Sequence, residues 1–369
     1  RAPPTSIAPD YAALISDLAL RRQVEAIAGD VSKAVASDHD TPAREHIEHA
    51  EQALYSLAET KSTGGFQALT HYLAGAVTQA AEAYSRDGGL SGISTGLIDL
   101  DQKIGGLHPS DLIILAARPS VGKTSLVLNF AENIALSGIP AGFFSLEMSS
   151  EQIAERVLCS QARVNLKHMR SGFFTKKDAS LLLQTANRIH DIPLYIDDTP
   201  NLTPSEVFSR SRRLKSRYPA LGMIILDYLQ LMSTGKRIEN RQQEVSEISR
   251  SLKILARDLR VPIIACSQLS RAVEKRDDHT PRLSDLRESG AIEQDADLVI
   301  FLHREVLKGT FEGEPEDETE AGKETHYTYK LIIGKHRNGP VGELDIYFAR
   351  EYTRFFDAAP EMPDEEVPF

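Results

Sequence analysis

The residues best suited to chemistry in this chain form a short turn, Gly122-Lys123-Thr124, between an apolar run and a helical pattern. The apolar run at 111–117 predicts a buried strand, and residues 125–137 predict a helix. Backbone N–H groups in such a turn and at a helix N-terminus bind anions. The Lys123 ammonium could reach the β- and γ-phosphates of a nucleotide, and the Thr124 hydroxyl could bind Mg²⁺. The turn therefore predicts a site for a nucleoside triphosphate and its metal ion.

One letter of this turn departs from the general pattern G-x-x-x-x-G-K-[ST], because position 117 is alanine. We expect Ala117 to keep a negative φ, since a left-handed conformation costs a residue with a Cβ roughly 1 kcal/mol. The alternative, a glycine turn that binds nothing, is disfavoured by the strand before it and the helix after it. The residues expected to contact the nucleotide are Arg118, Ser120, Val121, Gly122, Lys123, Thr124 and Ser125.

Three more polar side chains follow predicted strands, where ligands of parallel sheets bind. Asp227 follows the run Met-Ile-Ile-Leu, and a carboxylate there could hold the Mg²⁺ that bridges the phosphates. Glu147 is a candidate general base that aligns and deprotonates the attacking water. Gln268 could report the state of the γ-phosphate to the loops beyond it. Each residue alone could simply cap a strand, but three of them beside a phosphate loop favour one catalytic site.

Two further segments have charges or turn residues that suit a role beyond this pocket. Lys335 and Arg337 lie on a turn after a strand, and cations from a neighbouring chain could stabilise charge on the γ-phosphoryl group. A basic turn exposed to water is an equally good interpretation. The segment 284–297 contains one arginine and five acids, and its Gly and Ser suit a loop that approaches a phosphate backbone. Composition alone favours a mobile surface loop there. Four cations nearby could line a positive channel: Arg271, Lys275, Arg276 and Arg282.

These candidates are distributed over a region in which strands and helices alternate, which predicts an α/β fold with a mostly parallel sheet. Before it, helical spacing predicts a hairpin of two helices within residues 10–60 and a third helix at 66–85. That third helix lies between glycine-rich joints, so its apolar stripe must be buried in its own domain or on a neighbouring subunit. We expect a helical hairpin at 1–62, a linker at 63–91, the α/β domain at 92–358 with an acidic insertion at 310–324, and a disordered tail at 359–369.

The composition is that of a globular protein, with 41% hydrophobic and 26% charged residues. The net charge of −11 argues against a generally basic nucleic-acid coat, but it leaves room for a locally basic channel. No apolar run approaches the roughly 18 residues that cross a bilayer, so no membrane partner is expected. Cys159 and Cys266 are expected to be reduced core thiols of a cytosolic protein. Because the chain starts at Arg1, we also expect that its natural N-terminus is missing.

As a set, six motifs of the chain resemble those of the replicative hexameric helicases of the DnaB family. They are Ala-Arg-Pro-Ser-Val-Gly-Lys-Thr at 117–124, Ser-Leu-Glu-Met-Ser at 145–149, Ile-Ile-Leu-Asp-Tyr-Leu-Gln-Leu at 224–231, Ser-Gln-Leu-Ser-Arg at 267–271, Asp-Leu-Arg-Glu-Ser-Gly-Ala-Ile-Glu-Gln-Asp-Ala-Asp at 285–297 and Lys-His-Arg-Asn-Gly-Pro at 335–340. They span a RecA-like domain at about 92–358, and Ala117 matches this family's own form of the phosphate loop.

This resemblance implies a homohexameric ring in the bacterial cytoplasm that binds ATP and Mg²⁺ at subunit interfaces and moves 5′-to-3′ on single-stranded DNA at the replication fork. It implies phosphate and metal roles for Lys123, Thr124 and Asp227, and a catalytic role for Glu147. Lys335 and Arg337 would act on the neighbour's nucleotide. Three residues match the family's DNA loop: Arg287, Glu288 and Gly290.

Partners implied by the resemblance are a primase and a helicase loader, and the helix at 66–85 matches a linker that docks on the adjacent subunit. Primase contact is in doubt, because the N-terminal region it uses is incomplete in this sequence. The acidic insertion at 310–324 is not part of the family pattern. Two alternatives share the phosphate loop: a RecA-like recombinase that coats DNA as a filament, and a non-enzymatic assembly or clamp subunit with a degenerate nucleotide site. The linker helix and the Arg-Glu-Ser-Gly loop disfavour the first, and the intact pocket residues disfavour the second.

Overall fold

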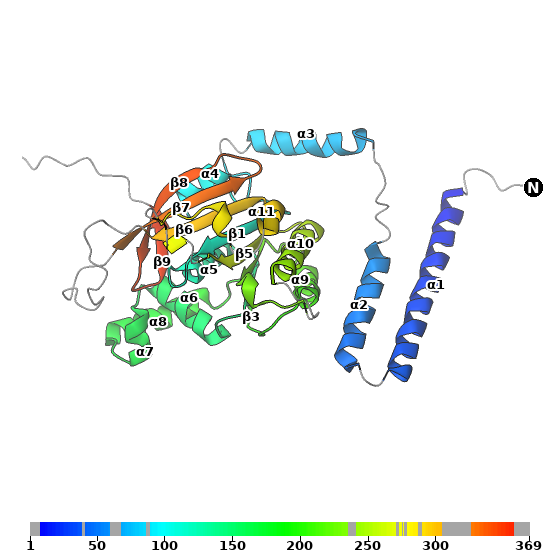
Figure 1. The fold of residues 1–369 in the computed structure, drawn as a ribbon, viewed down its shortest axis with the longest axis horizontal. Helices are drawn as coiled ribbons and strands as arrows, with labels where there is room; N and C mark the ends of the chain where they lie inside the picture. Colours follow the sequence, from blue (N-terminus) through cyan, green and yellow to red (C-terminus); the bar gives the residue numbers. More distant parts are fainter. Residues whose placement is uncertain are drawn as a thin grey trace, which may run out of the picture. The chain divides into compact units, whose positions relative to one another are not determined.

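The computed structural model describes residues 8–38, 41–59, 68–85, 89–234, 241–270, 273–274, 276, 279–286, 290–304 and 326–357. The chain divides into two compact units, residues 1–82 and 83–369 (Figure 1). The insertion expected at 310–324 and the tail expected at 359–369 lie outside the described residues. No helix among the described residues is long and apolar enough to cross a membrane.

The first unit contains the two helices that the sequence predicts, α1 (Ala8–Ser37) and α2 (Ala43–Glu59), which pack against each other. The third helix, α3 (Thr70–Ser85), begins later than predicted, and residues 60–67 lie outside the described part of the chain. Apolar side chains at the start and along α3 are exposed, among them Leu69, Leu73 and Val77. No other described residue buries the apolar stripe of α3 at these three positions.

The second unit is built on one nine-stranded sheet with the order β3-β2-β4-β5-β1-β6-β7-β8-β9. The strands from β3 to β6 in this order are parallel, and β7, β8 and β9 continue the sheet in antiparallel pairing. The strand bounds are β1 Leu112–Ala117, β2 Ala141–Ser145, β3 Leu194–Asp197, β4 Met223–Asp227, β5 Ile263–Gln268, β6 Leu298–Arg304, β7 His326–His336, β8 Gly342–Ala349 and β9 Arg354–Asp357. The predicted α/β fold with a mostly parallel sheet is confirmed.

Helices connect these strands and cover the sheet (Figure 1). Their bounds are α4 Ile98–Ile104, α5 Lys123–Leu136, α6 Ser150–Ala162, α7 Leu166–Ser171, α8 Lys176–Ile189, α9 Pro204–Arg217, α10 Arg241–Leu259 and α11 Gly290–Asp295. Two short 3₁₀ turns follow β4 and precede α11, η2 at Leu229–Leu231 and η4 at Leu283–Asp285. The sequence patterns did not predict α4, α7, α11 or β9.

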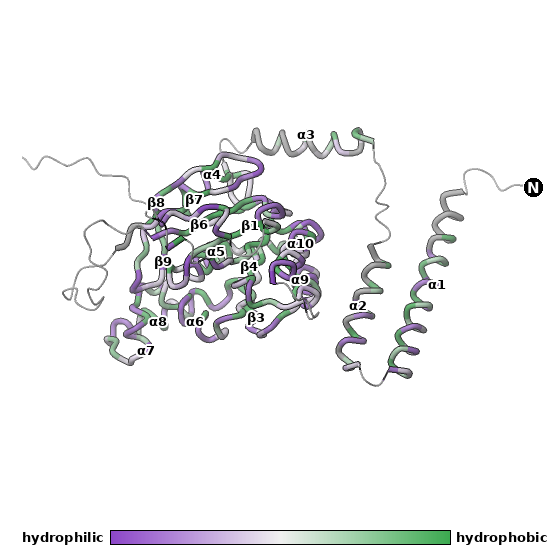
Figure 2. Tube along the Cα trace, viewed as in Figure 1, coloured by the Kyte–Doolittle hydropathy of each residue, from purple (hydrophilic) through white to green (hydrophobic). Residues whose placement is uncertain are grey.

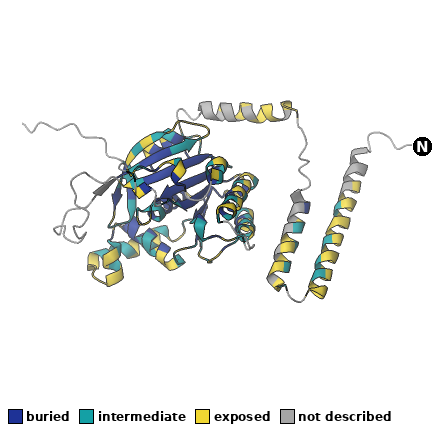
Figure 3. Cartoon of the chain, in the orientation of Figure 1, coloured by how far each residue is buried: buried dark blue, intermediate teal, exposed yellow. Residues whose placement is uncertain are grey.

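The core has two layers because successive residues of a strand point to opposite faces of the sheet. In β1, Ile113 and Leu115 pack with helix α5 on one side, whereas Leu112 and Ile114 pack with α10 on the other. All six residues of β1 are buried. The central strands are accordingly apolar in Figure 2 and buried in Figure 3. A strand buried on both faces reads as a continuous apolar run, which is why β1 is recognisable in the sequence.

Helix α4 was missed because its cap comes from the far end of the chain. The carboxylate of Asp357, which ends β9, accepts hydrogen bonds from the N–H groups of Ile98 at 2.9 Å and Asp99 at 3.1 Å. Free N–H groups at a helix N-terminus need such partners. No local pattern reveals a cap that lies so far away in the sequence.

Glu132 fixes the helix after the phosphate loop to its neighbour. It lies on α5 with 1% exposure, and its Oε2 accepts hydrogen bonds from Ser160 Oγ and Gln161 Nε2 of α6, both at 2.8 Å. Its Oε1 has no hydrogen-bond partner among the described residues. Burial raises the pKa of Glu132 from 4.5 to about 7, although the hydrogen bonds from Gln161 and Ser160 oppose the shift.

We expect Glu132→Gln to remove a pH dependence of stability. A carboxyl whose pKa is raised in the folded state stabilises fully below its unfolded pKa, and this contribution is lost as pH rises through about 7. Relative to wild type, the variant should therefore gain in thermal unfolding midpoint between about pH 5 and about pH 8. Glu151→Gln, an exposed position on α6, is the matched control and should show no such gain. An equal offset of Glu132→Gln at both pH values would contradict the shift.

Candidate functional site

The phosphate loop joins β1 to α5 through two residues with positive φ, Ser120 at 63° and Gly122 at 109°. Gly122 is the N-cap of α5, and a Cβ there would lie 3.1 Å from Cζ of Phe355. A glycine is thus required both by conformation and by the close approach of β9. Ala117 ends β1 and is not among the residues with positive φ, as expected. The N–H groups at the start of α5 are left facing the turn, which suits an anion.

Lys123, Thr124 and Asp227 form the polar centre of the site. Thr124 Oγ1 donates a hydrogen bond of 2.6 Å to Asp227 Oδ2, and Lys123 Nζ lies 3.3 Å from Asp227 Oδ1. The ammonium also lies 4.3 Å from the centre of the Tyr228 ring, within cation–π range. The Asp227 side chain is 2% exposed, so this is a charge held almost out of water. Such a carboxylate requires cationic or hydrogen-bonding partners.

One oxygen of Asp227 is incompletely satisfied. Oδ1 lies within ion-pair distance of Lys123 but has no hydrogen bond among the described residues. A hydroxyl oxygen and carboxylate oxygens are ligands that Mg²⁺ prefers, and Mg²⁺ usually keeps several waters and binds one or two protein groups besides phosphates. No group of three or more His, Cys, Asp or Glu suited to a metal occurs among the described residues. Thr124 and Asp227 therefore fit a magnesium ion that is shared with a nucleotide.

Cys266 of β5 lies beneath this centre and is fully buried. Burial, and next the neighbouring Asp227 carboxylate, raise the pKa of the Cys266 thiol well above its usual value. Cys266 and Cys159 are both free and buried, as the sequence predicts.

Glu147 stands in a short turn between β2 and α6. The turn is tied by Ser145, whose Oγ donates to Met148 O at 2.6 Å and accepts from Met148 N at 3.2 Å. Ser145 itself pairs with Asp227 across β2 and β4, which brings the turn beside the polar centre. The Glu147 residue is exposed and lies directly at the C-terminal edge of the sheet. This position suits a base that acts on a water molecule in the pocket.

Arg156 is a cation of this site that the sequence analysis missed. It lies on α6, and its Nη1 donates a hydrogen bond of 3.3 Å to Ser125 Oγ. Burial, and next the nearby Arg170, lower the pKa of Arg156, whereas Asp227 and Glu147 raise it. Its buried Nε has no partner among the described residues. No sequence pattern indicated a role for Arg156, because an arginine in the middle of an amphipathic helix resembles an ordinary surface residue.

Gln268 ends β5 beside the loop, since it pairs with Ala117 of β1. Its N–H donates to Gln230 Oε1 at 3.2 Å, and Gln230 Nε2 donates to Ser267 Oγ at 2.9 Å. Gln230, which the sequence analysis did not select, therefore links η2 after Asp227 to the end of β5. This link connects β4, which ends at Asp227, to β5, which ends at Gln268, the residue expected to report the state of the γ-phosphate.

Arg118 of the phosphate loop points to the segment after β5. Its Nη1 donates 2.8 Å to Leu269 O, and its Nε donates 2.8 Å to Glu274 Oε1. These two acceptors hold its side chain in this structure, and its contact with a nucleotide stays a prediction. Ser120 is exposed, Val121 is half-buried, and Ser125 is buried in the first turn of α5.

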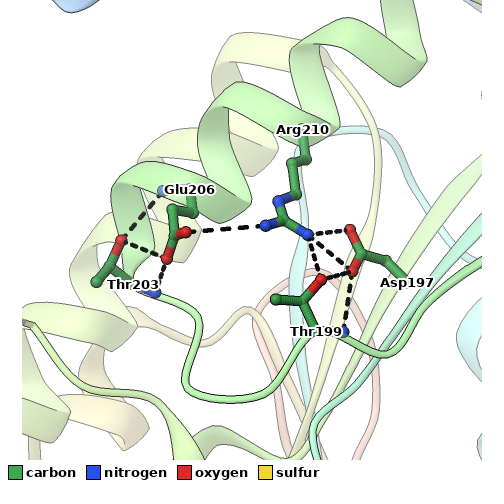
Figure 4. Close-up of polar contacts among 5 residues, drawn as sticks. All are labelled: Asp197, Thr199, Thr203, Glu206 and Arg210. Atoms are coloured by element: carbon green, nitrogen blue, oxygen red, sulfur yellow. Dashed lines mark hydrogen bonds and ion pairs between the residues drawn. The ribbon is translucent and has the colours of Figure 1, made fainter. Parts of the chain in front are cut away.

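Carboxylates at the end of β3 serve structure. Asp197 accepts hydrogen bonds from Arg210 Nη1 at 2.7 and 2.8 Å and from Thr199, and Arg210 also approaches Glu206 of the α9 capping box with Thr203 (Figure 4). Burial would raise the pKa of Asp197, but the bonds from Arg210 and Thr199 outweigh it and lower the pKa. The adjacent Asp198 accepts from Ser150 N at 2.8 Å and from Ser150 Oγ at 2.9 Å, which fixes the start of α6 just after Glu147.

Lys335 and Arg337 lie near the start of β1, whereas the phosphate loop follows the end of β1. Arg337 N donates to Asp297 O at 2.9 Å, and Asp297 N donates to Leu112 O, the first residue of β1, at 2.9 Å. β1 has six residues, which at about 3.3 Å per residue separates its ends by roughly 17 Å. These cations are therefore too far away to reach the phosphate loop of their own chain.

Both cations contact the end of α11. Lys335 Nζ donates to the carbonyls of Glu293 and Ala296, and Arg337 Nη2 donates to Gln294 O at 2.6 Å. Cations and donors at a helix C-terminus satisfy its free carbonyls. Burial, and next the charge of Arg337, lower the pKa of Lys335. The Arg337 side chain nevertheless stays 47% exposed.

The expected DNA loop is only partly described. Arg287 and Glu288 lie outside the described residues, whereas Gly290 is the first residue of α11 and is exposed. Of the four cations expected to line a channel, Arg271 and Lys275 are also outside them. The Arg276 side chain bonds to Thr280 O at 2.7 Å and pairs with Asp285, and the backbone N–H of Arg282 donates a hydrogen bond of 2.7 Å to Asp285 Oδ2. A channel lined by these residues stays a prediction.

Comparison with known proteins identifies relatives along nearly the whole chain. The family model of the DnaB-like helicase C terminal domain matches residues 92–357. The replicative DNA helicase DnaB of Leifsonia xyli subsp. xyli is 44% identical over 352 residues, which cover 95% of this chain and 74% of the relative. The replicative DNA helicase DnaC of Bacillus subtilis is 39% identical over 360 residues, 97% of this chain and 76% of the relative.

Solved structures of similar proteins share the fold. One of them, an ATPase domain, superimposes with a TM-score of 0.71 at 33% identity, and the match covers 80% of this chain and 100% of that domain. A DnaB-like replicative helicase, described with its interactions with primase, matches with a TM-score of 0.76 at 30% identity. This second match covers 96% of the present chain and 80% of the other.

Proposed function

The chain belongs to the DnaB-like helicase family, and on this premise we propose how its residues divide the work of an ATP-driven replicative DNA helicase. The observation that carries the proposal is the separation of the two halves of one site. Lys123, Thr124, Glu147 and Asp227 gather at the C-terminal edge of the sheet, and Arg337 lies at the other edge. A complete site then needs two copies of the chain.

In the nucleotide half, the N–H groups of the loop and of α5 bind the phosphates of ATP, and Lys123 neutralises charge on the β- and γ-phosphates. Thr124 and Asp227 hold Mg²⁺, which when bound neutralises the charge that develops on the phosphates. The ion pair with Asp227 and the cation–π contact with Tyr228 hold the Lys123 ammonium at this site. Glu147 aligns the attacking water and takes its proton.

Lys335 and Arg337 of the next copy complete the site by contacting the γ-phosphate. A head-to-tail arrangement that repeats this contact closes into a ring when the rotation permits, and we propose a homohexamer. The exposed apolar stripe of α3 supports contact with a neighbouring copy. A RecA-like recombinase remains less favoured, because replicative helicases match this chain over most of its length.

The loop around Arg287, Glu288 and Gly290 holds single-stranded DNA in the channel of the ring, and the ring moves 5′-to-3′ at the fork. Primase and a helicase loader are proposed partners. The similar helicase whose structure was described with primase supports the first of these. Unwinding of a forked duplex by the wild-type chain with ATP, and not with a non-hydrolysable analogue, tests the activity as a whole. A filament on DNA without strand separation would favour the recombinase.

We expect Lys123→Ala to lower ATP turnover by about 100- to 1000-fold, the usual cost of removing one strong stabiliser of transition-state charge. Steady-state phosphate release in the presence of single-stranded DNA measures the loss. Lys177→Ala removes an exposed lysine of α8 and serves as the control. Turnover of Lys123→Ala equal to that of the control would remove the nucleotide assignment.

We expect Arg337→Ala and Glu147→Ala each to be inactive alone and partly active when mixed. In a mixed ring, the intact pocket of an Arg337→Ala copy receives the intact Arg337 of its Glu147→Ala neighbour. An arginine acting on a neighbour's nucleotide is worth on the order of 10³-fold or more in turnover. ATPase activity is measured across mixing ratios after the two variants exchange subunits. Failure to recover activity at every ratio would show that Arg337 does not act in trans.

We expect Arg287→Ala to weaken binding of single-stranded DNA while basal ATPase activity persists. Each phosphate contact on a single strand contributes about 0.7 to the slope of log affinity against log salt, so the slope should fall by at least about that amount. Fluorescence anisotropy over a salt series gives the slope. Arg257→Ala, an exposed arginine of α10, is the charge-matched control. An unchanged slope for Arg287→Ala would place the DNA elsewhere.

A further inference from the structure

Asp297 lies where the chain turns from α11 into β6, and it is 5% exposed. Its hydrogen-bonding groups face in two directions. On one side it binds the start of β1, because Leu112 N donates 2.8 Å to Oδ2 and Asp297 N donates 2.9 Å to Leu112 O. On the other side it binds Arg337, whose Nη1 lies 3.1 Å from Oδ1.

Asp297 accepts two hydrogen bonds from Arg337. Arg337 N donates 2.9 Å to the Asp297 carbonyl, while the guanidinium donates to the carboxylate. The backbone bond fixes where the arginine starts, and the carboxylate fixes the direction of its side chain. A second guanidinium nitrogen, Nη2, is held by Gln294 O at 2.6 Å. Charge-assisted bonds of this kind are stronger and more directional than neutral ones.

The carboxylate is itself held by a rigid frame. Lys253 of α10 donates to Asp297 Oδ2 and also to Ser110 O at 2.8 Å. Lys253 therefore compensates the charge of this buried carboxylate and ties it to the segment before β1. The start of β1 and helix α10 thus both contact Oδ2 of one side chain, whose other oxygen faces Arg337.

Arg337 is held by hydrogen bonds but is not fully buried. Its side chain is 47% exposed, whereas that of Asp297 is 8% exposed. Two of the guanidinium nitrogens are engaged by described residues, Nη1 by Asp297 and Nη2 by Gln294. A guanidinium has five N–H donors, roughly three more than these two bonds use, and these can serve an anionic ligand. A fixed orientation matters because a displacement of about 1 Å at a reacting group can cost about 100-fold in rate.

We propose that Asp297 is a positioning residue for ATP hydrolysis on the neighbouring copy. It aims Arg337 outward from the edge of the sheet, so that the guanidinium meets the next copy's γ-phosphate without first losing conformational freedom. This proposal rests on the function proposed above, in which Arg337 acts in trans. Asp297 also bonds to the first residue of β1, and the phosphate loop of the same chain begins at the last residue of β1. The proposal therefore links the neighbour's site, through β1, to the phosphate loop of the chain that supplies Arg337.

The test is Asp297→Asn in the full-length chain. Asparagine retains an oxygen for Leu112 N but loses the charge that orients Arg337. We expect kcat to fall about 10- to 100-fold, with a KM for ATP within about twofold of wild type. We further expect activity to recover when the variant is mixed with Glu147→Ala copies, whose intact Asp297 and Arg337 serve the variant's own pocket. A residue that only maintains its own fold would show no such recovery.

Lys253→Gln supplies a second variant, because Lys253 contacts Asp297 through Oδ2 and not through the oxygen that faces Arg337. It should lower the thermal unfolding midpoint, as Asp297→Asn does, and yet lose much less kcat. The positioning role of Asp297 is refuted, while action of Arg337 in trans stands, if Arg337→Ala recovers with Glu147→Ala but Asp297→Asn does not. Turnover of Asp297→Asn at the wild-type rate would have the same meaning. If Arg337→Ala fails to recover as well, action in trans and the role of Asp297 fail together.

Discussion

The hydrogen-bond ladder of β1 is the interaction on which the rest of this molecule depends. β1 pairs with β5 on one side and with β6 on the other, and all six of its residues are buried. At its end, Ala117 O accepts a hydrogen bond from Leu269 N at 3.0 Å, and the phosphate loop begins. At its start, Leu112 is held by Asp297. One strand therefore carries a nucleotide-binding turn at one end and the anchor of Arg337 at the other.

The length of β1 is the reason why the proposed site needs two copies of the chain. The ends of β1 are roughly 17 Å apart, so the two polar centres cannot meet within one chain. In the proposed site, copies contact one another head to tail, and such an interface gives a ring if the rotation closes and a helical filament if it does not. The same local geometry therefore serves both classes of protein considered for this sequence. Their difference lies in what closes the assembly, for which the exposed stripe of α3 is the natural candidate.

The sequence predicted the parts of the fold whose signals are local. Buried strands read as apolar runs, so the parallel sheet and the places of Glu147, Asp227 and Gln268 at strand ends were predictable. Partners brought together by tertiary structure were not. The cap of α4 by Asp357 depends on such a long-range contact, and so does the contact of Arg156 with Ser125. Lys335 shows the same limit, because nothing local indicated that the carbonyls of α11 hold it. A motif gives the position of a residue along the backbone, whereas the direction of a long side chain depends on acceptors that other elements supply.

Three buried carboxylates in the α/β unit show how burial separates acids that look alike in sequence. Glu132 is desolvated, none of the cations in the described part of the chain bonds to it, and burial raises its pKa to about 7. Asp297 lies between two cations, because Lys253 and Arg337 both donate to it, and each of its oxygens accepts a hydrogen bond. Asp227 has the Thr124 hydroxyl on one oxygen, while the other lies near the Lys123 charge and accepts no hydrogen bond from any described residue. A buried, charged oxygen with unused capacity is costly unless a ligand completes it. Of the three acids, Asp227 is the one at the phosphate loop, and its unused oxygen fits the magnesium ion proposed there.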